Sequence, residues 1–107
     1  MDYKIFWSDE SLNNLEAVLS YLETEWTERE VTIFKNKLSK QLDLIQKNPK
    51  LFPISNVQPR LRKAVLSKQT TIFYELKGFE IHIAFLFSNR MDIRRIRKAG
   101  RFNRPAH

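Results

Sequence analysis

Basic side chains that could bind phosphate or another anion gather in two parts of this sequence. Arg60, Arg62 and Lys63 enter a predicted strand, and the turn after that strand carries a lysine. Arginine suits phosphate because its planar guanidinium donates two parallel hydrogen bonds. The second group follows the last predicted strand, where residues 90–104 hold seven bases and one acid. The candidate target-binding or phosphate-binding residues are therefore Arg60, Arg62, Lys63, Lys68, Arg90, Arg94, Arg95, Arg97 and Lys98.

Few side chains could move a proton beside these cations. His82 alternates with Ile81 and Ile83, so it is expected on the outer side of a sheet. A lone histidine there is more often structural than catalytic, because a general base must first lie within hydrogen-bond reach of its proton. Glu75 and Glu80 flank a hairpin and could form a carboxylate pair, but cross-strand surface charges are the commoner arrangement. The catalytic residues, if the chain is an enzyme, are left unknown.

The composition also limits metals and cofactors. Two histidines, no cysteine and scattered carboxylates offer no metal-ligand spacing, and disulfides are excluded. The glycines are Gly78 and Gly100, so no glycine-rich phosphate loop is present. We therefore expect neither a metal nor a nucleotide cofactor.

Length and hydropathy predict one small cytoplasmic domain over residues 1–107. The chain is long enough for one domain and too short for two, and the absence of cysteine suits a reducing compartment. No apolar run reaches the roughly 20 residues of a membrane span, and the N-terminus lacks the pattern of a signal peptide. Residues 98–107 have little to bury and are expected to form a flexible basic tail.

Charge is distributed unevenly along the chain, whose net charge is +7. Residues 8–30 hold seven acids and one base, which is typical of a solvated helix surface. The opposite excess in residues 90–104 indicates a surface that meets a polyanion or an acidic protein. Residues 91–98 are either a helical turn that docks Ile93 and Ile96 or a disordered basic tail that orders when a partner binds.

Two helices are expected after a short strand at residues 2–7. Ser8 is the expected N-cap of a helix over 9–26, and Thr27 with Glu30 forms a capping box that starts the second helix at once. Asn48-Pro49 ends that second helix. With almost no linker, the helices must fold back as a hairpin. The buried stripe of the second helix is Val31, Phe34, Leu38, Leu42 and Ile45.

A proline-containing loop over 49–59 and three strands, 61–66, 70–77 and 79–87, complete the chain. Short connections make the strands an antiparallel meander, so the fold class is α+β with two layers. Ile72, Tyr74 and Leu76 should share the core face of the middle strand. In the last strand, strict alternation predicts one core face, made of Phe79, Ile81, Ile83, Phe85 and Phe87, and Phe73 is also expected in the core. Ala84 and Leu86 would then form an apolar patch on the opposite face.

Four segments together resemble the RelE/ParE superfamily of toxins from type II toxin–antitoxin systems. They are IFWSDESLNNLEAVLSYL, FKNKLSKQLDLIQKNPKLFP, LRKAVLSKQTTIFYEL and IHIAFLFSNRMD, and the resemblance covers about residues 3–98. It implies an antitoxin partner, expected to be acidic, whose helical or extended segment wraps the toxin.

The resemblance also implies two mechanisms. ParE-like members block DNA gyrase, whereas RelE-like members cut messenger RNA on the ribosome and commonly carry a tyrosine shortly after the last strand. That tyrosine would align near Ile96, and Thr71 or a neighbour replaces an expected base, so the ParE-like reading is favoured. The alternatives are a RelE-like ribonuclease, a decayed toxin, and a non-toxic nucleic-acid-binding module with strongly salt-dependent binding.

Overall fold

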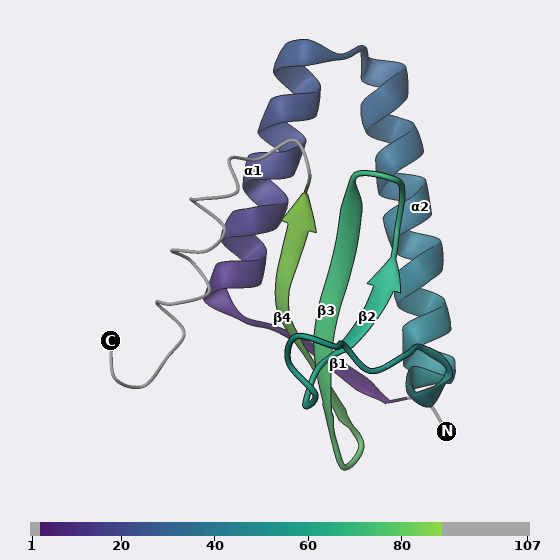
Figure 1. The fold of residues 1–107 in the computed structure, drawn as a ribbon. Coiled ribbons are helices and arrows are strands. Elements are labelled where there is room, and N and C mark those ends of the chain that lie inside the picture. The colour runs from purple at the N-terminus through teal and green to yellow at the C-terminus, as the bar shows by residue number, and fades with distance from the viewer. Residues whose placement is uncertain (1–2, 89–107) are drawn as a thin grey trace.

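A computed structural model describes residues 3–88 as two helices packed on one face of a four-stranded sheet (Figure 1). The two-layer α+β class expected from the sequence is confirmed. In chain order the elements are β1 (Lys4–Trp7), α1 (Asp9–Glu25), α2 (Glu28–Lys47), a 3-10 turn (Pro49–Leu51), β2 (Arg62–Val65), β3 (Thr70–Lys77) and β4 (Glu80–Ser88). None of the helices in this part of the chain is long and apolar enough to cross a membrane.

Side-chain caps start both helices where the sequence places them. The Ser8 hydroxyl accepts a hydrogen bond from the amide of Ser11 at 3.0 Å, and the Thr27 hydroxyl accepts from the amide of Glu30 at 3.3 Å. Each cap satisfies an amide that the first helical turn leaves unpaired. The chain therefore reverses at Trp26 and Thr27, and the two helices form the expected hairpin.

The strands lie in the order β1-β4-β3-β2, with β1 parallel to β4 and the other pairs antiparallel. The first strand lies at one edge of the sheet, and its partner is β4. The register pairs Lys4 with Glu80 and Trp7 with Ile83. This pairing carries the start of α1 onto β4, where Ser8 donates its amide to the carbonyl of Ile83.

The core lies between the helices and the sheet. As expected, Tyr74 is fully buried, and its hydroxyl donates to the carbonyl of Pro49. The predicted stripe of α2 is also buried, except that Leu42 is only half-buried. The core cluster consists of Val18, Phe34, Leu38, Ile45, Ala64, Ile72, Tyr74, Ile81, Ile83 and Leu86.

A β-bulge at Ala84 reverses the alternation of β4. Phe73 pairs with Phe85 but the next residue, Tyr74, pairs with Ile83, so one residue of β4 is extra. A bulge of this kind turns every later side chain to the other face. The Ser8 hydroxyl donates to the Ala84 carbonyl at 2.8 Å, which satisfies a backbone group at the bulge.

The bulge corrects the core prediction for the second half of β4. Leu86 is 1% exposed and belongs to the core, whereas strict alternation placed it on the opposite face. Phe85 and Phe87, predicted in the core with Ile81 and Ile83, are only half-buried. Strict alternation was therefore wrong from Ala84 onward.

Phe79 was also wrongly predicted in the core. Its side chain is 70% exposed, and it belongs to the β3–β4 turn, which projects beyond the helices (Figure 1). Its described aromatic contact is with Tyr3, at 5.8 Å between ring centroids. The loop over 49–59 was expected to be irregular, but it contains the 3-10 turn and a bridge between Ile54 and Arg62.

Candidate functional site

The face of the sheet that neither helix covers is the candidate site, here called the helix-free face. Its described side chains alternate with the core set and lie opposite one another across the strands. Lys63 pairs with Phe73, which pairs with Phe85, and Glu75 pairs with His82. The helix-free face comprises Phe6, Lys63, Phe73, Glu75, Lys77, Glu80, His82 and Phe85, with Arg60 at its margin.

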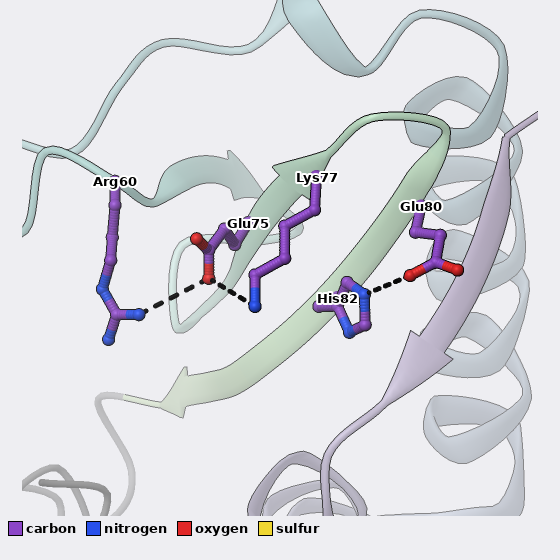
Figure 2. Close-up of polar contacts among 5 residues, drawn as sticks. All are labelled: Arg60, Glu75, Lys77, Glu80 and His82. Carbon is purple, nitrogen blue, oxygen red and sulfur yellow. Dashed lines mark hydrogen bonds and ion pairs between the residues drawn. The ribbon is translucent and has the colours of Figure 1, made fainter. Parts of the chain in front are cut away.

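Charged side chains gather at one end of this face (Figure 2). Glu75 lies 3.4 Å from the guanidinium of Arg60 and 3.9 Å from the ammonium of Lys77. The two basic side chains are both 60% exposed. Such exposed pairs contribute little to stability, typically about 0–1 kcal/mol. Arg60 and Lys77 can therefore exchange Glu75 for an anionic partner at small cost.

His82 forms the second polar contact of the helix-free face. Its Nε2 lies 2.9 Å from a carboxylate oxygen of Glu80 (Figure 2). Its ring also stacks on that of Phe6, with 5.2 Å between the ring centroids. The outward position expected for His82 is confirmed. Glu75 faces His82 and Glu80 faces Lys77 across the strands, so each carboxylate meets a basic side chain. This arrangement is that of cross-strand surface charges.

Aromatic side chains adjoin the charged ones. Phe73 and Phe85 stack at 4.7 Å between centroids, with 19° between the ring planes. Both are half-buried, which corrects the prediction that they pack in the core. The helix-free face thus combines a stacked aromatic pair with exposed cations. The bulge explains why alternation misplaced Phe85, whereas Phe73 alternates regularly with the buried Ile72 and Tyr74.

Arg62 is separated from Arg60 and Lys63, although the three are nearly consecutive. Its Nη1 donates to the carbonyls of Phe52 at 2.7 Å and Lys50 at 3.4 Å, and it lies opposite the buried Tyr74. A guanidinium held by backbone carbonyls secures the loop that precedes β2. Of the other candidates, Lys68 is an exposed residue of the β2–β3 turn. The other candidates lie outside the described residues; they are Arg90, Arg94, Arg95, Arg97 and Lys98. The predicted helical turn over 91–98 and the predicted flexible tail over 98–107 also lie outside them.

The two arginines should respond differently to truncation. Arg62→Ala should lower the free energy of unfolding by about 2 kcal/mol, because it leaves two loop carbonyls without a charged donor. Arg60→Ala should change it by less than about 0.5 kcal/mol, as is usual for an exposed surface residue. Urea unfolding of the two variants measures this difference, and equal losses would contradict the loop-securing role of Arg62.

Comparisons with known proteins establish the fold. No protein-family model matches the sequence, and no curated protein is significantly similar to it. Solved structures do match. The chromosomal ParDE toxin–antitoxin system of P. aeruginosa gives a TM-score of 0.67 at 17% identity, over 80% of this chain and 95% of that one. YafQ from E. coli gives a TM-score of 0.56 at 14% identity, over 82% of this chain and 94% of that one. The YoeB dimer from Staphylococcus aureus gives a TM-score of 0.54 at 16% identity, over 79% of this chain and 94% of that one.

These structures define the class to which the fold belongs. The chain has the fold that these solved structures share, which agrees at the level of architecture with the resemblance noted in the sequence. Of these three structures, the ParDE system has the highest TM-score with this chain.

Proposed function

We propose that this chain is the toxin of a type II toxin–antitoxin pair, and that it arrests growth by binding an essential target such as DNA gyrase. The helix-free face carries the proposal: a stacked aromatic pair lies beside exposed cations on a fold shared with such toxins. Aromatic and arginine side chains are the residues that dominate protein–protein binding energy. A cognate antitoxin would silence the chain. One solved structure that this chain resembles is that of the E. coli DinJ-YafQ toxin-antitoxin complex.

The same face suits an acidic antitoxin segment. Arg60, Lys63 and Lys77 offer positive charge, while Phe73 and Phe85 offer apolar area. An acidic amphipathic segment would match both properties, since complementary charge steers association and fixes register. Binding of this kind needs no catalytic group on the toxin.

A ribonuclease is the second candidate function, and His82 is the observation that favours it. His82 and its carboxylate partner Glu80 lie on the same face as Arg60 and Lys77 (Figure 2). Such a group could transfer a proton while cations stabilise a phosphate. Tyr74 cannot take that part, because burial raises its pKa to about 12 and its hydroxyl is bound to Pro49 inside the core.

Tightly controlled expression in a bacterial host tests the proposal. As growth stops, messenger RNA ends and DNA supercoiling are followed together. Intact messages with gyrase-type DNA damage are the expected result. If messages are cleaved when the wild type is expressed but stay intact with His82→Ala, the chain is a ribonuclease and the gyrase proposal is wrong. Unimpeded growth would indicate a decayed toxin or a plain nucleic-acid-binding module.

Removal of charge from the helix-free face should weaken target inhibition. For Arg60→Ala with Lys63→Ala, we expect the concentration that half-inhibits gyrase supercoiling to rise about tenfold, equivalent to about 1.4 kcal/mol of binding. Lys35→Ala with Lys40→Ala removes the same charge from exposed positions on α2 and is the matched control. If both double variants weaken gyrase inhibition equally, the effect comes from the net charge of the protein and not from the helix-free face.

A further inference from the structure

A second candidate surface lies between the C-terminal half of α1 and the N-terminal half of α2. A cavity of about 270 Å³ opens there at the end of the sheet, and we call it the hairpin pocket. Its apolar lining includes Tyr21, Leu22, Trp26, Ile33 and Phe34. Trp26 is 41% exposed and Ile33 is 37% exposed. Large apolar side chains that remain exposed around a cavity mark a docking surface.

The end of the sheet lies at the rim of this pocket. Ser88, the last residue of β4, is part of the lining, together with Thr70 at the start of β3. Residues 89–107, outside the described range, therefore leave the sheet at the pocket itself. A covalently attached segment acts at an effective concentration in the millimolar range, which favours it over a separate occupant.

Charge complementarity points to the same segment. α1 carries Asp9, Glu10, Glu16, Glu23 and Glu25 and has no basic residue. β4 lies against α1, as the hydrogen bond from the Leu86 amide to the Asn14 side chain at 3.0 Å shows. Residues 90–104 carry seven bases and one acid, so they leave β4 beside an oppositely charged helix.

The charges of the two helices favour docking of this basic segment on α1 rather than on α2. The last turn of α1 contains no basic residue, although a cation is favoured at a helix C-terminus. α2 instead exposes Lys35, Lys37 and Lys40, and Lys37 is part of the pocket lining. A basic segment is therefore attracted to α1 and repelled by the lysines of α2.

We propose that residues 89–107 fold back along α1 and dock in the hairpin pocket. Ile93 and Ile96 enter the apolar lining, and the arginines between and beyond them face the exposed carboxylates Glu16, Glu23 and Glu25. The occupant is this chain's own segment, bound within one molecule. The docked state neutralises the main basic segment of the free protein, whatever target the helix-free face binds.

The chain contains no cysteine, so a single thiol can report on this contact in the full-length protein. Ala99→Cys is labelled with bimane, a fluorophore that tryptophan quenches on contact, and Trp26 is the expected quencher. Emission should rise at least twofold when Trp26→Phe is added, whereas Trp7→Phe, which changes a tryptophan of β1, should leave it unchanged. Equal emission with and without Trp26 would overturn the proposal.

Charge changes, salt and dilution distinguish docking of the chain's own segment from docking of a second copy or of a separate partner. Glu23→Lys or 1 M salt should raise the emission, because salt reduces the Debye length to about 3 Å. Asp43→Lys makes the same charge change at an exposed position on α2 away from the pocket lining and should have no effect. Quenching should persist on dilution. Its loss on dilution would assign the pocket to a second copy, and quenching that needs an added protein would assign it to a separate partner; either result overturns docking within one chain.

Discussion

Leu86→Ala should lower the free energy of unfolding by about 2–5 kcal/mol, the usual loss for a fully buried leucine. Leu86 is 1% exposed, so truncation leaves a cavity beneath α1 that the surrounding core can only partly fill. A domain of this size is stabilised by only about 5–15 kcal/mol in total. The variant should therefore be visibly less stable at growth temperature.

Phe79→Ala is the matched control, because strict alternation assigns the two residues to the opposite positions. Phe79 is 70% exposed, and its loss should cost about 1 kcal/mol or less. Urea unfolding followed by circular dichroism gives both values, with an unchanged slope confirming that the same surface unfolds. A larger loss of stability for Phe79→Ala than for Leu86→Ala would support strict alternation along β4 and contradict the bulge at Ala84.

Stability should also fall steeply above pH 10 through Tyr74. Burial raises the pKa of Tyr74 from 10.0 in the unfolded chain to about 12 in the fold, against a smaller lowering by Arg62. The fold therefore favours the protonated phenol. This contribution is fully present below pH 10 and is lost as the pH rises from 10 to 12, at up to about 1.4 kcal/mol per pH unit. The total loss is on the order of 2–3 kcal/mol.

Tyr74→Phe isolates this effect. The variant should lose about 1–2 kcal/mol at pH 8, because the Pro49 carbonyl loses its donor, but its stability should fall less between pH 10 and pH 12. Ile72→Val is a core control with a loss of about 1 kcal/mol and no ionisable group, so it should keep the pH dependence of the wild type. If urea unfolding shows the same alkaline decline in Tyr74→Phe, another group titrates.

Local sequence was sufficient for the helical hairpin and for the existence of the strands. The caps at Ser8 and Thr27 act on amides three residues away, and the stripe of α2 follows from helical periodicity alone. Each depends on neighbours in the chain, so the residues themselves carry the information. The order of these elements, together with the four quoted segments, also predicted the architecture that this chain shares with the solved structures.

Tertiary contacts decided which side chains share the helix-free face. Arg60, Arg62 and Lys63 are nearly adjacent in sequence, yet Arg62 binds the carbonyls of a loop ten residues earlier. The bulge in β4 is held by Ser8, whose hydroxyl reaches the Ala84 carbonyl across 76 residues of chain. Alternation within one strand cannot reveal a contact at that separation, and a shift of one residue moves every following side chain to the other face. Consequently, Phe85 lies beside the exposed cations and Leu86 lies in the core.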